Sequence, residues 1–130
     1  MSCRVLIVED DDAYAEILTV LLESDPRFEV VGRARDGDEG IALAQQLSPD
    51  VITMDIDMPR TDGVEATAAI CASDPSQRIV VVSGSIFYDR IDEARAAGAS
   101  AFVAKAHATD ELTGVVLEVC RGGDFVAVPT

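Results

Sequence analysis

Short runs of apolar residues recur along the chain at roughly regular intervals, and each run is bounded by charged residues or glycine. These runs cover residues 5–8, 28–31, 51–54, 79–82 and 101–104. They do not alternate with polar residues, which is typical of strands in a parallel sheet covered on both faces. Between the runs, apolar residues follow helical spacing, as in residues 14–22 and 112–119. The pattern predicts five strand–helix repeats, and therefore an α/β fold with a parallel sheet and helices on both of its faces.

Acidic and hydroxyl residues mark the expected starts of several helices. Asp36 and Asp62 each precede a glutamate by three positions, which is the spacing of a capping box. Thr109 is expected to cap the last helix, and the two acidic residues after it favour the positive end of a helix. Asp11 and Asp12 are expected to cap the first helix and to lie in its first turn. The caps and the apolar spacing therefore predict the same helices.

The composition narrows the classes of protein to which the chain can belong. It has 130 residues, 48% of them apolar, and a formal net charge of −14, with 24 acidic and 10 basic residues. This length and apolar content predict one folded domain rather than a disordered chain. The acidic balance argues against direct binding of nucleic acid or of an anionic membrane. No apolar run is long enough to span a bilayer, so we expect a cytoplasmic protein.

The cysteines and the C-terminal residues give weaker signals. Cys3, Cys71 and Cys120 are odd in number and far apart, so we expect reduced thiols in the core rather than a disulfide or a zinc site. Residues 122–130 contain a Gly-Gly pair and end in Pro-Thr, and no element is predicted for them. We therefore expect a domain at residues 1–121, followed by a tail or the start of a linker at 122–130.

Carboxylates follow two of the predicted strands, at the edge where parallel sheets bind ligands. Glu9 and Asp10 follow the first strand, and Asp55 and Asp57 follow the third. Carboxylates gathered in this way repel one another unless a cation lies among them. Mg²⁺ suits such a site, because it takes one or two carboxylates and leaves positions for water and phosphate oxygens. An aspartate beside the ion can act as a nucleophile toward phosphorus.

Groups that can bind a phosphoryl group follow two further strands, and only the second strand contributes none. Ser83 comes after the fourth strand, and Lys105, the only lysine of the chain, comes after the fifth. An ammonium and a hydroxyl can each hold one oxygen of a transferring phosphoryl group. The other basic residues are arginines. Four of them are expected at solvated surface positions: Arg33, Arg35, Arg60 and Arg90.

Four segments, in this order and spacing, resemble the receiver domain of bacterial two-component response regulators. They are residues 5–11, 49–63, 80–84 and 97–105. The resemblance covers about residues 4–121. It implies a flavodoxin-like fold, a doubly wound five-stranded parallel sheet with strand order 2-1-3-4-5 and helices on both faces. One departure is Ala106, which follows Lys105 where many receivers have proline.

The resemblance also implies a role for each residue at the carboxyl edge. Asp55 is the expected phosphoacceptor, and Mg²⁺ is the expected cofactor. The implied metal ligands are Glu9, Asp10, Asp55 and the main-chain carbonyl of Asp57. The implied catalytic and phosphate-binding residues are Ser83, Gly84 and Lys105. Ser83 and the aromatic Phe102 are the expected switch residues, which couple phosphorylation to the shape of the surface.

The resemblance further implies partners and an output. A sensor histidine kinase or a phosphotransfer protein is the expected phosphoryl donor. The face formed by the fourth helix, fifth strand and fifth helix is expected to carry the signal. Homodimerisation through this face is one way in which it could do so. Apolar residues 86–88 fit either the core side of the fourth helix or this surface. The tail resembles a segment that leads into a helix-turn-helix domain of the nitrate-response type, which favours control of transcription. A chemotaxis methylesterase and a freely standing receiver stay open.

Three other functions fit the sequence less well than this resemblance does. Asp55 and Asp57 also fit the Asp-x-Asp pair of a haloacid-dehalogenase-like phosphohydrolase, but in that family the pair usually follows the first strand. A dinucleotide-binding domain needs a glycine-rich turn where this chain has acidic residues. A degenerate receiver would lack some of the motif residues that are all present here. We therefore expect a phosphoacceptor that is no enzyme beyond its own phosphorylation and dephosphorylation.

Overall fold

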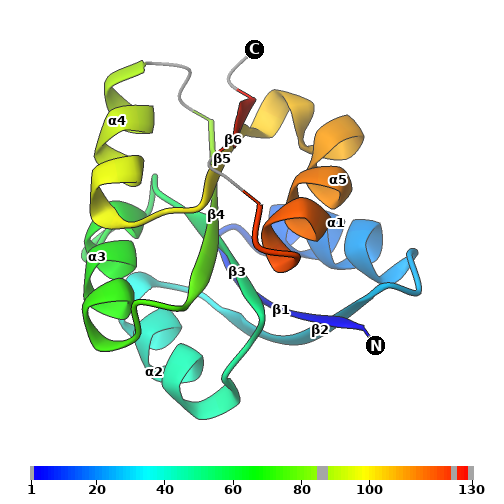
Figure 1. Ribbon diagram of the computed structural model, residues 1–130, viewed down its shortest axis with the longest axis horizontal. Helices are drawn as coiled ribbons and strands as arrows, with labels where there is room; N and C mark the ends of the chain where they lie inside the picture. Colours follow the sequence, from blue (N-terminus) through cyan, green and yellow to red (C-terminus); the bar gives the residue numbers. More distant parts are fainter. Residues whose placement is uncertain (1, 85–87, 124–125, 129–130) are drawn as a thin grey trace.

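A computed structural model describes residues 2–84, 88–123 and 126–128, and it contains one parallel sheet (Figure 1). The strands are β1 (Cys3–Val8), β2 (Phe28–Ala34), β3 (Val51–Asp55), β4 (Arg78–Ser83), β5 (Ala101–Ala104) and β6 (Val126–Val128). The helices are α1 (Asp12–Glu23), α2 (Gly37–Leu47), α3 (Gly63–Ser73), α4 (Tyr88–Ala97) and α5 (Ala108–Cys120). A single 3-10 turn, η1 (Lys105–His107), joins β5 to α5.

The helices cover both faces of the sheet, because the strands are apolar on both sides. Figure 1 shows α2, α3 and α4 on one face and α1 and α5 on the other. Strand residues divide accordingly: Val5 and Ile7 pack with α1 and α5, whereas Leu6 and Val8 pack on the opposite face. This alternation follows from the two-residue period of a strand. The prediction of an α/β fold with a doubly covered parallel sheet is confirmed.

The strand order is β2-β1-β3-β4-β5-β6, which contains the predicted order 2-1-3-4-5 and adds one strand at its end. The additional strand, β6, lies in the tail, where the sequence predicts no element. It pairs in parallel with β5, so that Ala101, Phe102 and Val103 face residues 126–128. The chain thus makes a sixth strand after α5, in the same way as after each earlier helix.

Most of the predicted helix starts agree with the structure. The carboxylate of Asp36 accepts a hydrogen bond from the Glu39 amide, and that of Asp62 accepts one from the Glu65 amide. Asp11 caps α1 by accepting from two amides of its first turn. The prediction for Thr109 is wrong: α5 begins at Ala108, so Thr109 lies inside the first turn rather than before it.

Gly63, the first residue of α3, allows the helix to pass directly over the end of β3. A Cβ atom at this position would lie 2.1 Å from the carbonyl oxygen of Asp55 and 2.6 Å from the Cα atom of Ile56. Both are backbone atoms, which cannot move aside without displacing the strand. The glycine therefore fixes how closely α3 approaches the end of the strand that carries Asp55.

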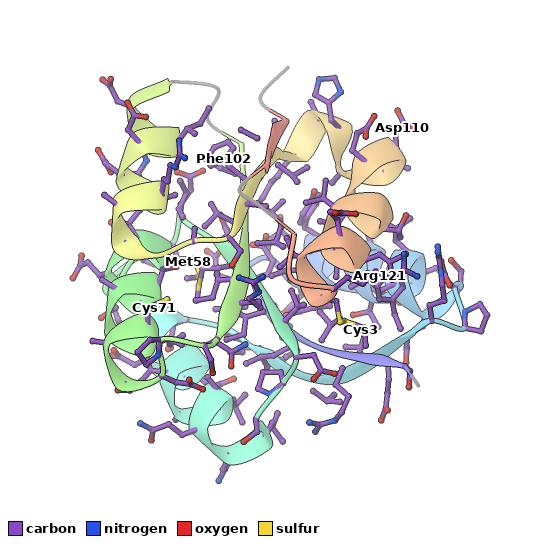
Figure 2. The ribbon with its side chains drawn as sticks, viewed as in Figure 1. Cys3, Met58, Cys71, Phe102, Asp110 and Arg121 are labelled. Carbon is purple, nitrogen blue, oxygen red and sulfur yellow. A yellow bond between two sulfur atoms is a disulfide. The ribbon has the colours of Figure 1, made fainter. Side chains whose placement is uncertain are left out.

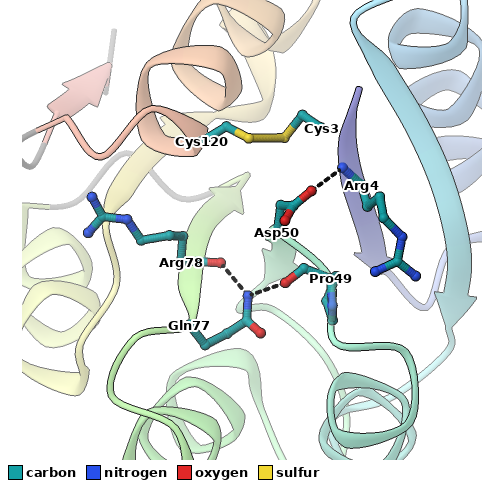
Figure 3. Close-up of a disulfide and its surroundings, with 7 residues drawn as sticks. All are labelled: Cys3, Arg4, Pro49, Asp50, Gln77, Arg78 and Cys120. Atoms are coloured by element: carbon teal, nitrogen blue, oxygen red, sulfur yellow. Dashed lines mark hydrogen bonds between the residues drawn. A yellow bond between two sulfur atoms is a disulfide. The ribbon is translucent and has the colours of Figure 1, made fainter. Parts of the chain in front are cut away.

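Two of the three cysteines form a disulfide, contrary to the prediction of three reduced thiols. Cys3 and Cys120 are bonded, and their Cα atoms lie 6.5 Å apart (Figure 3). The sequence does not reveal the pair because 117 positions separate the two residues. The fold brings them together, since β1 begins where α5 ends. Cys71 is a free thiol in α3, on the other side of the sheet (Figure 2).

Within the described ranges, no helix combines the length and apolar character needed to cross a bilayer. Residues 86 and 87 of the predicted apolar patch lie outside those ranges.

Candidate functional site

The carboxyl edge of the sheet brings together the acidic residues that follow β1 and β3. These strands are neighbours, with Val8 paired to Met54, so their next residues lie side by side. One carboxylate oxygen from each of Glu9, Asp10 and Asp55 lies within 4.8 Å of the others. Glu9 and Asp55 are buried, with exposed fractions of 1% and 2%, whereas Asp10 is exposed. The predicted acidic cluster therefore exists, with two buried members and one that faces solvent.

Lys105 lies against this cluster from the end of β5. Its Nζ atom is 2.9 Å from Oε1 of Glu9 and 3.4 Å from Oδ2 of Asp55, and its side chain is 25% exposed. The ammonium also lies 4.4 Å from the centre of the Tyr14 ring, within range of a cation–π interaction. One cation thus faces two buried carboxylates, and the aromatic ring of α1 covers one side of it.

Asp57 and Ser83 form the other side of the site. The main-chain amide of Asp57 donates to Oδ1 of Asp55 at 2.9 Å, which holds the Asp55 carboxylate in place. The Ser83 hydroxyl donates to Oδ2 of Asp57 at 2.9 Å. Gly84 follows, and a Cβ at that position would come no closer than 4.0 Å to Oδ2 of Asp57. The structure therefore links the end of β4 to the loop after β3 through the Ser83–Asp57 hydrogen bond.

Burial shifts the ionisation of the two buried carboxylates. It is the main reason that the pKa of Glu9 rises from 4.5 to about 7, with Lys105 acting in the opposite direction. Burial also raises the pKa of Asp55. The hydrogen bond from the Asp57 amide stabilises the charged form and lowers this pKa, but burial has the larger effect. Burial lowers the pKa of Lys105, but its contact with Glu9 and the charge of Asp55 outweigh burial and leave that pKa above its ordinary value. The lysine is therefore protonated, and ionisation of both carboxyl groups would leave more negative charge than one lysine can balance.

The donor set of this cluster fits a hard divalent cation. All three side chains offer carboxylate oxygens, which Mg²⁺ prefers, and the exposed Asp10 leaves the site open to water and to phosphate oxygens. A dication here would offset the repulsion between Glu9 and Asp55 that one lysine leaves uncompensated. The predicted ligands Glu9, Asp10 and Asp55 are thus brought together.

Arg33 lies against the acidic site, so the expectation of a solvated surface position is wrong for this residue. Its guanidinium donates to the carbonyl oxygen of Glu9 at 3.0 and 2.7 Å and to Oδ1 of Asp12 at 2.7 Å, and its side chain is only 20% exposed. Arg33 therefore holds the backbone at the point where β1 leads into the acidic loop. Its guanidinium lowers the pKa of Asp12 through this hydrogen bond.

Arg90 also departs from the expected solvated position. It pairs with Glu93 and donates to the carbonyl oxygen of Ile56 at 3.4 Å, which ties α4 to the loop after β3. No sequence signal marks either Arg33 or Arg90, since both depend on contacts between distant segments.

Phe102, the expected switch aromatic, is completely buried in β5 (Figure 2). It belongs to the core on the side of α3 and α4, together with Ile79, Val81 and Ile91. Ser83 lies at the end of the neighbouring strand, paired with Ala104. The arrangement places both expected switch residues on adjacent strands, and their switching role stays a prediction.

We expect Mg²⁺ to bind more tightly as the pH rises through about 7. The ion competes with the proton on Glu9, whose pKa is about 7, so one displaced proton should increase the affinity about tenfold between about pH 6 and pH 8. Isothermal titration calorimetry at the two pH values measures this directly. The Glu9→Gln variant is the control and should show weaker binding with little pH dependence. Equal affinities of the unmodified protein at both pH values would contradict the prediction.

The same shift affects folding stability without the ion. The pKa of Glu9 is 4.5 when exposed and about 7 in the folded protein, so its contribution is fully present below about pH 4.5 and is lost as the pH rises through about 7. The loss amounts to about 3 kcal/mol of unfolding free energy. Thermal unfolding without Mg²⁺ should therefore occur at a lower temperature at about pH 8 than at about pH 5.5. These two pH values lie on either side of the pKa of Glu9 in the folded protein, which is about 7.

Comparisons with known proteins identify the family. Residues 5–117 match the response regulator receiver domain. Protein-glutamate methylesterase/protein-glutamine glutaminase 3 of Myxococcus xanthus is 46% identical over 110 residues, which are 82% of this chain and 31% of that protein. Transcriptional regulatory protein LiaR of Bacillus subtilis is 37% identical over 119 residues, which are 92% of this chain and 56% of that protein. The chain thus spans between about a third and just over half of the length of these relatives.

A solved structure supports the same assignment. The response regulator domain of Thermotoga maritima CheB superposes with a TM-score of 0.88 at 32% identity, covering 93% of this chain and 98% of that one. The relatives include both transcription regulators and methylesterases, and they share the receiver domain. Receiver domains bind Mg²⁺ for phosphorylation, and the acidic cluster of Glu9, Asp10 and Asp55 is present here. The chain belongs to the family of response regulator receiver domains of two-component systems.

Proposed function

We propose that this domain accepts a phosphoryl group on Asp55 and thereby changes the face formed by α4, β5 and α5. One observation carries the proposal: the buried Asp55 carboxylate ends β3 with Lys105 Nζ at 3.4 Å and carboxylate oxygens of Glu9 and Asp10 within 4.8 Å. A carboxylate that could act as nucleophile, a cation suited to phosphate and carboxylates suited to a metal ion therefore lie close together, which supports the proposal. A sensor histidine kinase or a phosphotransfer protein would supply the phosphoryl group.

Each residue of the site would have a separate role in the transfer of the phosphoryl group. An oxygen of the Asp55 carboxylate attacks phosphorus, the bond from phosphorus to the donor's histidine nitrogen breaks, and an acyl phosphate forms. The amide of Asp57 orients the nucleophile through its hydrogen bond to Oδ1. Lys105 neutralises one phosphoryl oxygen as a point charge. Bound Mg²⁺, held by Glu9, Asp10, Asp55 and the carbonyl of Asp57, would supply neutralisation of further phosphoryl charge.

Ser83 would carry the signal from the phosphoryl group to the surface. Its hydroxyl donates to Asp57 in this structure, and donation to a phosphoryl oxygen instead would break the link between the end of β4 and the loop after β3. With Gly84 adding a main-chain amide, the segment after β4 would shift toward Asp55. Phe102, in the adjacent strand, would then repack and alter the face of α4, β5 and α5.

The test is incubation with acetyl phosphate and Mg²⁺, followed by intact-mass and peptide analysis. We expect the mass of one phosphoryl group on Asp55, and beryllofluoride should block it. A haloacid-dehalogenase-like phosphohydrolase would instead release phosphate from varied phosphate esters over many turnovers. Such turnover, or a modification at another residue, would contradict the proposal.

Replacing Lys105 by alanine tests the switch separately from the transfer. We expect phosphorylation to be slower by about tenfold or more, because one charged group no longer stabilises the transferring oxygens. Once phosphorylated, the variant should lack the change in amide hydrogen exchange at α4 and α5 that the unmodified domain shows. Lys105→Arg keeps the charge but not the compact ammonium, and serves as the control. An undiminished exchange response in Lys105→Ala would overturn the role of this residue in switching.

For the output, we propose control of transcription, which the relative LiaR and the tail's resemblance to a segment before a helix-turn-helix domain support. A methylesterase relative is 46% identical, against 37% for LiaR, although this chain covers a smaller share of it, and a methylesterase output is therefore the second candidate. Whether α4, β5 and α5 also mediate homodimerisation is tested by light scattering with and without beryllofluoride.

A further inference from the structure

We infer that Cys3 and Cys120 form a redox-responsive site, at which a low-molecular-weight disulfide such as glutathione disulfide oxidises both thiols and closes the chain into a ring. The site lies at the opposite end of the sheet from Asp55. It involves no residue of the phosphorylation site and is independent of the proposed function. Its basis is the placement of the two cysteines, their access to solvent and the contrast with the third cysteine.

The start of β1 and the end of α5 lie next to each other, and each carries one of the two cysteines. Cys3 is the first residue of β1, and Cys120 is the last residue of α5. Their Cα atoms are 6.5 Å apart, within the range that a disulfide spans without backbone movement. The backbone around Cys3 is firmly held: its amide donates to the carbonyl of Arg27 at 2.7 Å, and the next residue, Arg4, donates to Asp50 at 2.8 Å (Figure 3). The bond therefore joins two ordered elements.

The pair opens onto the surface, which exchange with small thiols requires. A hollow of about 280 Å³ lies over it, lined by both cysteines together with Arg27, Asp50 and Arg121. Cys3 is 5% exposed, whereas Cys120 is half-buried. An incoming thiolate therefore reaches the sulfur of Cys120 first. The charges at this mouth are mixed, because Asp50 lies among the two arginines and Arg27 is paired with Asp25.

Cys71 provides a contrast within the same chain. It lies in α3 on the other face of the sheet, and its thiol contacts the carbonyl oxygen of Gly98 at 3.7 Å. Burial, followed by the charge of Asp74, raises the pKa of this thiol, which disfavours the reactive thiolate. Oxidation should therefore select Cys3 and Cys120 and leave Cys71 reduced.

The reaction balances as two exchange steps. The thiolate of Cys120 attacks one sulfur of glutathione disulfide, forming a mixed disulfide and releasing one glutathione thiolate. The thiolate of Cys3 then attacks the Cys120 sulfur, which forms the internal bond and releases the second glutathione thiolate. The two protons lost by the cysteines go to the two released thiolates. Two protein thiols are oxidised, and one disulfide is reduced to two thiols.

Closing this ring should affect stability and the start of the tail. The bond spans 117 positions, nearly the whole domain, and so restricts the unfolded chain strongly. Directly after Cys120, the amides of Gly122 and Gly123 turn back to the carbonyls of Val119 and Glu118. Gly122 adopts the left-handed conformation, with φ of 85°, that such a helix end requires. The disulfide thus anchors the turn from which the chain leads to β6.

The test equilibrates the full chain with glutathione and glutathione disulfide at several ratios. Free thiols are then alkylated and counted by mass, and thermal unfolding is measured in parallel. We expect two protected cysteines under oxidising conditions, and a midpoint about 10 °C lower after reduction. Amide exchange in the last turn of α5 should be faster in the reduced protein.

Matched variants separate the pair from a general effect of oxidation. Cys120→Ser should unfold at the same temperature under both conditions, near the midpoint of the reduced protein. Cys71→Ser should behave like the unmodified chain. The unfolding midpoints of the oxidised and reduced unmodified chain can be compared directly, so this part of the test holds even if a variant fails to fold. All three thiols remaining open to alkylation, protection of Cys71, or an unchanged midpoint would each overturn the inference. So would stoichiometric Zn²⁺ on Cys3, Asp50 and Cys120 together with resistance to glutathione disulfide, which would assign a metal site instead.

Discussion

Replacing Asp55 by asparagine is expected to reduce phosphate incorporation to background. The amide has nearly the same shape as the carboxylate and can still accept the hydrogen bond that the Asp57 amide donates to Oδ1. It cannot attack phosphorus as a carboxylate does, so the acyl phosphate does not form. The substitution also removes one of two buried negative charges that face Lys105. The variant should therefore fold at least as stably as the unmodified domain.

The measurement compares incorporation from acetyl phosphate in the presence of Mg²⁺ for three proteins. Asp57→Asn is the matched control, because it makes the same chemical change two residues away and should still be phosphorylated. The unfolding midpoint of Asp55→Asn shows that any loss is chemical and not structural. Persistent incorporation in this variant would place the acceptor at another residue.

Replacing Gly63 by alanine is expected to cause the largest loss of stability from a single methyl group. The new Cβ would lie 2.1 Å from the carbonyl oxygen of Asp55, so either α3 or the end of β3 must shift. Overpacking of this kind costs about 3 kcal/mol of unfolding free energy, a large part of the roughly 5 to 15 kcal/mol of a typical domain. Because the displaced strand end carries Asp55, phosphorylation should slow as well.

Gly114 offers a control for this substitution within the same fold. It lies on the exposed side of α5, and a Cβ there would meet nothing within 4 Å. Alanine at Gly114 should therefore raise the unfolding free energy by about 0.5 to 1 kcal/mol, since glycine disfavours a helix interior. Urea unfolding of both variants gives the two values. Equal stabilities would show that the close approach of α3 to β3 does not constrain the fold.

The sequence predicts that these residues gather at one edge of the sheet, because most of them directly follow a strand. Their roles in phosphorylation stay predictions. Apart from Phe102, which lies inside β5, each predicted site residue stands at or just after the end of a short apolar run, and parallel strands carry those ends to one edge. The run before Asp55 is completely buried, as its lack of alternation predicts. Asp36 and Asp62 are likewise local signals, since a cap acts over three residues. Such features need no knowledge of which strands are neighbours.

The features that the sequence does not predict depend on contacts between distant segments. Arg33 reaches Glu9 because β2 pairs with β1 through an irregular register, in which Val5 faces Val30 and Leu6 faces Gly32. Arg90 reaches Ile56 only once α4 lies over the loop after β3. The disulfide requires the complete sheet, because Cys3 and Cys120 stand at opposite ends of the sequence.

The added strand β6 alters the surface through which receivers of this family are expected to signal. In the predicted five-stranded sheet, β5 would be the edge, and its outward-facing amides and carbonyls would be open to another chain. Here residues 126–128 pair with them. A partner that approaches between α4 and α5 therefore meets the domain's own tail. To add a strand directly to β5, it would have to compete with a segment that is covalently attached and always at high local concentration.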